Sequence, residues 1–239
     1  MTAEFRRDEL RNRYDVDSIE EDPWHTYTGL RTASLLANVL PGIGLSGVRV
    51  LNAGAGVYAI PVPSEDQFFV DLFAAPMKGR KNAVCASIEQ LPFGEAVFEC
   101  VVCVGEVLSY CDPAAALREF ARILSPKGHL VFDFGSTHSI VHWRTDLFGR
   151  AADILTDQYN GSSEKVWRYS PSYIRGLLEA NGFGIRQTHG IHTWSAVAKR
   201  LGANEARALM VQRWLEMVRL PSAWADVLTI VAVKETSAR

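Results

Sequence analysis

The sequence predicts an α/β fold, with a doubly wound, mostly parallel sheet of seven strands and helices on both faces. Three observations support this expectation. Short apolar segments show little polar alternation, which is typical of parallel strands covered on both sides. Helical patterns separate these segments and imply crossover connections. The 239 residues are 48% apolar and 22% charged, enough for one continuous core, so we expect a single domain over residues 1–239.

The expected elements follow one another along the whole chain. Residues 1–45 are predicted to be helical, with a break at Asp22-Pro23 and a stop at Pro41-Gly42, and we expect them to form an N-terminal lid. Strands are expected at 48–53, 68–72, 83–86, 100–104, 129–134, 184–189 and 227–233.

Three later helices are predicted by their boundaries and apolar spacing. The first begins at Asp112 and Pro113 and ends at Ser125-Pro126, and the others are expected at 170–181 and 205–219. Residues 135–167 give few clear signals. We therefore expect residues 135–225 to contain insertions on the substrate side of the fold.

Composition and charge exclude several classes of function. The net charge is −2 and the pI about 6.3, and the N-terminal arginines are interleaved with Asp and Glu, so no nucleic-acid partner is expected. No apolar run reaches ~18 residues and no leader opens the chain, so we expect no membrane partner and a cytoplasmic location. Four cysteines fit a reducing compartment. Cys100 and Cys103 lie three apart on one strand and face opposite ways, so no metal site is predicted.

A glycine turn follows the first predicted strand, in the segment VRVLNAGAGVYA (48–59). Gly54 and Gly56 have no Cβ and would let a ligand lie against the backbone. Asp71 ends the next strand, where its carboxylate can accept hydrogen bonds from a ribose diol. Together these residues predict a nucleoside-bearing cofactor at the edge of the sheet.

The turn alone does not identify the cofactor. GAGVYA with Asp71 also matches a dinucleotide site, which would make the chain an NAD(P)-linked oxidoreductase. The crossover after the turn is short and contains Pro61 and Pro63, whereas a dinucleotide needs a helix N-terminus at its pyrophosphate. A third alternative is a non-catalytic binding or regulatory protein with this fold.

Four further segments occur in a fixed order: ASIEQLPF (86–93), FECVVCVGEVLSY (98–110), AALREFARIL (115–124) and SPKGHLVFDF (125–134). This set resembles the class I S-adenosylmethionine-dependent methyltransferase family, in its small-molecule branch. The resemblance implies a Rossmann-like methyltransferase fold and S-adenosylmethionine as cofactor. It also implies methyl transfer to a small-molecule acceptor by in-line displacement.

The resemblance also implies roles for particular residues. The turn would lie under the methionine moiety, Asp71 would hold the ribose with Leu72 beside it, and Ser87 and Ile88 would flank the adenine. The segment after the fourth strand would line the sulfonium side, and Tyr14 of the lid would contact the cofactor. The full expected set is Tyr14, Asn52, Ala53, Gly54, Ala55, Gly56, Asp71, Leu72, Ser87, Ile88, Val104, Gly105 and Glu106. Asn52, Tyr58 and Ser87 depart from the family's usual residues.

Glu106 and His138 are the candidate catalytic residues, because each follows a strand at the edge where the cofactor is expected. Either side chain could take a proton from a hydroxyl or ammonium acceptor. His142 is expected to be an exposed loop histidine, and Asp133 a structural residue. Aromatic residues of the lid could exclude water from the site: Tyr14, Trp24, His25 and Tyr27.

Overall fold

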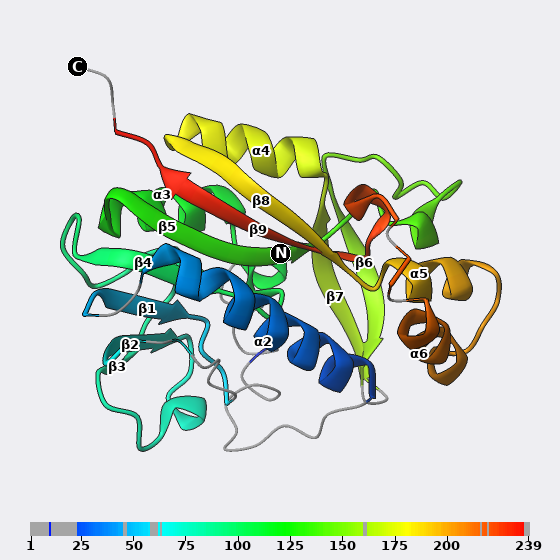
Figure 1. Ribbon diagram of the computed structural model, residues 1–239, viewed down its shortest axis with the longest axis horizontal. Helices are drawn as coiled ribbons and strands as arrows, with labels where there is room; N and C mark the ends of the chain where they lie inside the picture. Colours follow the sequence, from blue (N-terminus) through cyan, green and yellow to red (C-terminus); the bar gives the residue numbers. More distant parts are fainter. Residues whose placement is uncertain are drawn as a thin grey trace.

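The computed structural model describes residues 10, 23–44, 47–57, 62, 64–159, 162–215, 217–218 and 220–236. Seven strands form one sheet in the order β3-β2-β1-β4-β5-β9-β8 (Figure 1). Their bounds are Arg49–Ala53 (β1), Asp66–Asp71 (β2), Ala83–Cys85 (β3), Phe98–Cys103 (β4), Leu124–Gly135 (β5), Phe183–Ile191 (β8) and Val227–Lys234 (β9). β1 to β5 pair in parallel, and β9 runs antiparallel to both β5 and β8. The predicted doubly wound, mostly parallel sheet is confirmed.

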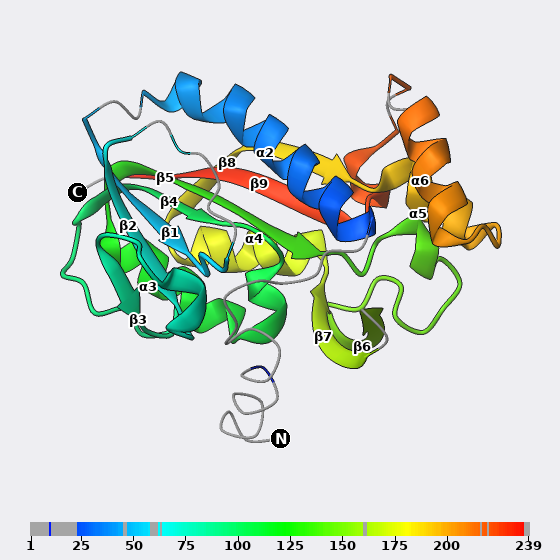
Figure 2. The same ribbon diagram turned by 90° about the horizontal axis from the view of Figure 1, so that it is seen from below.

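Helices cover both faces of this sheet. α2 (Pro23–Ile43) lies along one face, while α3 (Pro113–Ile123) and α4 (Pro171–Ala180) lie on the other (Figure 2). Beyond the carboxyl end of β5 lie α5 (Thr193–Arg200), α6 (Glu205–Trp214) and a hairpin of β6 (Ala152–Tyr159) with β7 (Ser162–Tyr169). Short 3₁₀ turns complete the chain: Ala75–Met77 (η1), Val107–Tyr110 (η2), Ile140–His142 (η3) and Ser222–Trp224 (η4).

The two faces bury separate apolar clusters. Leu36 and Leu40 of α2 pack on Val50 and Cys100, whereas Phe120 of α3 belongs to the cluster on the opposite face. Cys103 belongs to that opposite cluster too. The prediction that Cys100 and Cys103 face opposite ways is therefore confirmed.

The capping residues act as the sequence indicates. The Asp112 carboxylate accepts the backbone N–H of Ala114 at 2.9 Å, and the Ser170 hydroxyl accepts that of Tyr173 at 3.1 Å. Each satisfies a backbone donor that has no partner inside its helix. α3 and α4 thus begin where predicted.

Several element boundaries differ from expectation. α2 continues through Pro41 to Ile43, and α6 ends at Trp214 rather than at 219. β5 begins at Leu124, directly after α3, because Leu124 already pairs with Phe98 before a register shift in the ladder. The β6–β7 hairpin and α5 were not predicted.

The connection between β1 and β2 holds no helix in its described residues, 54–57, 62 and 64–65. A glycine turn of this kind usually begins a helix, and none of these described residues is helical. Nor does any helix in the described part of the chain have the length and apolarity needed to span a bilayer.

Candidate active site

The glycine turn after β1 touches the loop after β4. Gly54 has a φ of +67°, and a Cβ there would lie 2.5 Å from Cγ2 of Val107. Only glycine combines the backbone conformation of Gly54 with such a close approach. Gly56 also has a positive φ, +51°, but no atom of the described residues lies within 4 Å of a Cβ placed there. The two loops form one continuous edge, and the described residues leave room for a ligand above Gly56.

Asp71 lies at the tip of β2, directly against this turn. One carboxylate oxygen accepts the N–H of Gly56 at 2.9 Å, and the other accepts the N–H of Phe73 at 3.0 Å. Burial raises the pKa of Asp71, although the backbone N–H donors and the nearby Arg80 act in the opposite direction. The carboxylate therefore fixes the turn, and each oxygen keeps a second lone pair for a ligand hydroxyl.

Arg80 holds the other side of the turn. Its guanidinium donates to the carbonyl of Val57 at 2.9 Å and to that of Ala55 at 3.4 Å, and it lies over the ring of Phe69. Arg80 thus satisfies two backbone carbonyls of the turn, a role that the sequence did not reveal.

The loop after β4 is fixed by one buried carboxylate. Asp133 of β5 accepts the N–H of Gly105 at 3.0 Å and that of Glu106 at 2.7 Å. Gly105 and Glu106 both have positive φ, +95° and +56°. Burial raises the pKa of Asp133 to about 6, against the opposing effect of the two N–H donors. Asp133 thus positions Glu106, which agrees with its expected structural role.

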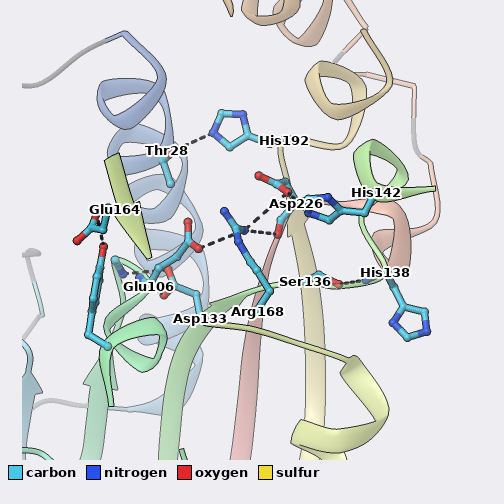
Figure 3. A network of polar contacts seen from close by, with 12 residues as sticks. Thr28, Glu106, Asp133, Ser136, His138, His142, Glu164, Arg168, His192 and Asp226 are labelled. Atoms are coloured by element: carbon cyan, nitrogen blue, oxygen red, sulfur yellow. Dashed lines mark hydrogen bonds and ion pairs between the residues drawn. The ribbon is translucent and has the colours of Figure 1, made fainter. Parts of the chain in front are cut away.

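The Glu106 side chain belongs to a charged network (Figure 3). Nη1 of Arg168, which comes from β7, lies 3.3 Å from Oε2 of Glu106 and 3.7 Å from Oδ1 of Asp226. The Arg168 side chain is only 5% exposed. Gly135 makes room for it, since a Cβ there would lie 2.2 Å from the guanidinium nitrogen. The guanidinium bridges two carboxylates and fixes the orientation of Glu106.

His142 extends this network from η3. Its Nε2 lies 3.9 Å from Oδ1 of Asp226, and the residue is buried, so the expectation of an exposed loop histidine was wrong. The misjudgement arose because η3 packs against α5, which was not predicted. Burial raises the pKa of Asp226, but the positive charge of Arg168, joined by His142, His192 and Lys199, outweighs it and holds the pKa below its usual value.

His138 does not join Glu106. Its ring points away from the Arg168 network and lies 5.6 Å from the ring of Phe148 (Figure 3). Its backbone N–H donates to the Ser136 hydroxyl at 3.0 Å. A catalytic role for His138 stays a prediction, and its place on the far side of the network makes Glu106 the better candidate.

The described lid residues contact the start of α5. Trp24 stacks on His192 with ring centroids 3.8 Å apart, and Thr28 Oγ1 lies 2.7 Å from His192 Nε2. Tyr27 is buried beside the same ring. Tyr14 and Tyr58 lie outside the described residues, as does the His25 side chain. α2 is thereby tied to α5 at the end of the molecule where the network lies (Figure 3).

The remaining cofactor candidates lie along the same edge of the sheet. Ser87 follows β3, and its hydroxyl contacts Glu89 at 3.2 Å, while Ile88 is buried in the core. Asn52 is buried and donates to Gln67 at 3.2 Å, which turns its amide toward β2. Val104 is buried, and Ala53 and Leu72 continue β1 and β2. Among the described residues, no group of three or more His, Cys, Asp or Glu could hold a metal ion.

Comparison with known proteins decides what this site belongs to. A family described as "Methyltransferase domain" matches residues 66–132. Malonyl-[acyl-carrier protein] O-methyltransferase of Herminiimonas arsenicoxydans is 31% identical over 184 residues, which cover 66% of this chain and 70% of that protein. The chain belongs to the class I S-adenosylmethionine-dependent methyltransferase family.

Two further relatives agree with this assignment. Demethylmenaquinone methyltransferase of Mycolicibacterium paratuberculosis is 30% identical, and the match covers 55% of this chain and 59% of that protein. The crystal structure of Burkholderia thailandensis 1,6-didemethyltoxoflavin-N1-methyltransferase, with S-adenosylhomocysteine bound, has a TM-score of 0.56 at 19% identity. That match covers 97% of this chain and 88% of the other, and it shows a common fold.

The residues present in this methyltransferase fit its cofactor, S-adenosylmethionine. The open surface over Gly56 accommodates a ligand against the backbone, and the Asp71 carboxylate lies beside it with acceptor capacity for ribose hydroxyls. The fit is weaker at Asn52. Its neutral amide donates to Gln67 and would place no negative charge opposite the ammonium group of the cofactor's methionine moiety.

Sequence reasoning missed three charged residues of the methyltransferase site: Arg80, Arg168 and Asp226. The Asn160-Gly161 pair between β6 and β7 is a strong hairpin signal and could have revealed the strand that carries Arg168. Asp226 stands directly before an apolar strand, as Asp71 stands at the end of one. Nothing in the sequence near Arg80 indicates its contact with the turn.

Proposed function

We propose that this methyltransferase transfers the methyl group to a nucleophilic atom of an acceptor bound beside Glu106. The observation that supports this most is the meeting of the two loops, because Val107 contacts Gly54 while the neighbouring Glu106 reaches Arg168. This arrangement sets the proposed cofactor surface and a carboxylate next to each other. Asp133 fixes both N–H groups of the loop that carries them.

Positioning accounts for most of the proposed rate. Bound S-adenosylmethionine supplies an electrophilic methyl group on a good leaving group. Holding acceptor and donor in line can contribute roughly 7–11 kcal/mol to lowering the barrier, whereas a general base typically adds 10²–10⁴-fold. Glu106 would accept the proton of a hydroxyl or ammonium acceptor at its carboxylate, which Arg168 holds in place. Asp71 would bind the ribose.

Aromatic residues around Glu106 support an acceptor that is apolar or carries a ring. Tyr110 of η2 donates to Glu164 of β7 at 3.2 Å, and Trp167 and Tyr169 stack at 6.3 Å on the same strand. The curated relatives differ in acceptor, since one is named for malonyl-[acyl-carrier protein] and another for demethylmenaquinone. We propose that residues 135–225 contain the acceptor side of the site.

We favour this function over the alternatives for one structural reason. An oxidoreductase would need a helix N-terminus at the pyrophosphate, and none of the described residues between β1 and β2 is helical. We also propose a cytoplasmic location. In support, no disulfide joins Cys85, Cys100, Cys103 or Cys111 in the described part of the chain.

Two substitutions test the proposed roles. Asp71→Ala is expected to weaken S-adenosylmethionine binding by at least tenfold in calorimetry, because the ribose loses its acceptor and the turn loses the Gly56 contact. Glu106→Gln is expected to lower turnover by about 10²-fold while changing cofactor affinity little. The matched control is Glu179→Gln, which lies exposed on α4, and it should change neither quantity.

Each result has a clear counterpart that would contradict the proposal. Unchanged affinity in Asp71→Ala would remove that residue from the cofactor site. Full turnover in Glu106→Gln, measured with a set of candidate hydroxyl, carboxyl and amine acceptors, would show that another residue is the general base.

A further inference from the structure

One face of the molecule collects positive charge although the whole chain is slightly acidic. We define the basic face as α2 together with residues 183–220, which comprise β8, α5, α6 and the segment after α6. Among its described residues are Arg31, Arg186, Lys199, Arg200, Arg207 and Arg213, against the single carboxylate Glu205; Arg186 also lies 3.6 Å from Glu235 of the neighbouring chain segment. The complete chain has 25 basic and 27 acidic residues. This imbalance favours an anionic partner.

Large apolar side chains protrude from the same face. Met210 and Trp214 are 54% and 84% exposed on α6, and Met217 and Val218 after it are 92% and 51% exposed. Their spacing of three to four residues places Met210 and Trp214 on one side of α6, whereas Leu209 and Gln212 are buried on the other. Arg207 and Arg213 are exposed on the same helix. α6 thus presents an apolar stripe edged by arginines.

A groove lies between α6 and α2 on this face. Its volume is about 870 Å³, and it runs along β8, with Leu35 and Val39 of α2 on one side and Val218 and Leu220 on the other. Its charged or titratable lining residues are Arg31, His129, Arg186 and His189, and no carboxylate is among its lining residues. In both ribbon views α2 and α6 lie on the outside of the molecule (Figures 1 and 2).

We propose that the basic face rests on an anionic phospholipid bilayer, with Trp214, Met217 and Val218 inserted at the interface. Arginines beside apolar side chains are the usual composition of surfaces that lie in the headgroup region. Long basic side chains can pair with phosphates while their stems cover apolar surface. The groove beside Val218 adds a surface without carboxylate lining residues to the same face.

A bilayer explains the exposure better than an acidic protein does. Trp214 and Met217 protrude almost fully, and a fluid surface can receive protruding side chains without a matching pocket. The proposed contact is peripheral. It differs from the membrane-spanning interaction that the sequence argues against, and it revises the expectation that the chain has no membrane partner.

Vesicle flotation of the complete protein tests this proposal. We expect at least tenfold more binding to vesicles that contain phosphatidylglycerol than to pure phosphatidylcholine, and less binding as salt is raised. Arg207→Glu/Arg213→Glu and Trp214→Ser/Met217→Ser should each reduce binding by more than tenfold, since one surface Lys or Arg contributes about fivefold. Far-ultraviolet circular dichroism confirms that each variant is folded.

Matched controls come from outside the basic face. Arg118→Glu/Arg175→Glu makes the same charge change on α3 and α4, and Trp143→Ser removes an exposed tryptophan after η3. Both should bind like the unmodified protein. Equal binding to the two kinds of vesicle, or equal loss in the control variants, would overturn the proposal. Retention on a heparin column without vesicle binding would also overturn it, because the face would then bind an acidic macromolecule. A dimer in light scattering that Trp214→Ser/Met217→Ser abolishes would overturn it too, because the face would then bind a second copy of the chain.

Discussion

At the scale of single residues, Asp133 connects the core to the proposed chemistry. Its carboxylate is completely buried and accepts the N–H groups of Gly105 and Glu106, in the loop after β4. A buried carboxylate needs such donors to remain ionised. The position of Glu106 therefore depends on the charge state of a residue that touches neither substrate nor cofactor.

This dependence predicts a pH effect. The pKa of Asp133 is raised to about 6, so the carboxyl gains a proton as the pH falls through that value. Protonation occupies one oxygen and weakens its contact with Gly105 or Glu106. We expect kcat/KM to fall below pH about 6. The pKa of Asp133 is higher in the folded state than its ordinary value of 3.8, so the folded state binds the proton more tightly. The contribution of Asp133 to the free energy of unfolding therefore rises as the pH falls from about 6 to 3.8.

Asp133→Asn separates these effects. The amide keeps the size of the side chain but presents a donor to one of the two loop N–H groups. We expect turnover to fall at least tenfold and to lose the inflection near pH 6. An inflection that persists unchanged in Asp133→Asn would assign it to another group, and urea unfolding at pH 7 would show whether the variant remains folded.

At the scale of elements, β1, β4 and β9 were predictable because each is a short, largely apolar run that is buried on both faces of the sheet. β8 and β9 match their predicted ranges within about two residues at each end. The hairpin of β6 and β7 was missed because its strands lie outside the main sheet and mix Thr, Asp and Lys with apolar residues. α5 was missed because it is short and follows β8 directly, at the left-handed residue His192.

The glycine turn is held by one charged side chain. Arg80 donates to the carbonyls of Ala55 and Val57. Hydrogen bonds from charged donors contribute about 1.5–3 kcal/mol each. We predict that Arg80→Gln weakens S-adenosylmethionine affinity about tenfold in calorimetry. The stability of the fold should change little, because Arg80 is partly exposed and lies outside the main core.

Arg118→Gln on α3 is the matched control for this substitution, since Arg118 is exposed on the opposite side of the sheet from α2. It should leave cofactor affinity unchanged. If Arg80→Gln bound S-adenosylmethionine as tightly as the control, the turn would hold its shape through Asp71 alone.

At the scale of the whole molecule, the site is assembled from distant parts of the chain. Asp71 and Glu106 were predictable because a parallel sheet brings the ends of neighbouring strands to one edge. Arg168 and Asp226 were not predictable, because these two contacting residues lie 58 positions apart in the sequence, on β7 and just before β9. No local pattern predicts which charged residues meet at such a distance. Only the packing of the hairpin against η2 and β5 brings Arg168 to Glu106.

Because the site joins β1, β2 and β4 to the hairpin, its ligand should stabilise the entire fold. A ligand that binds only the folded state at 100 times its Kd adds about 2.7 kcal/mol to the free energy of unfolding. For a chain of this size, 1 kcal/mol raises Tm by roughly 2–4 °C. We therefore predict that saturating S-adenosylmethionine or S-adenosylhomocysteine raises Tm by about 5–10 °C in a thermal-shift assay. NAD and NADP should leave Tm unchanged, since none of the described residues between β1 and β2 is helical and could hold their pyrophosphate. The shift with S-adenosylmethionine should shrink in Asp71→Ala but persist in Glu179→Gln. A larger shift with NAD than with S-adenosylmethionine would contradict the assignment of this edge to an adenosyl sulfonium.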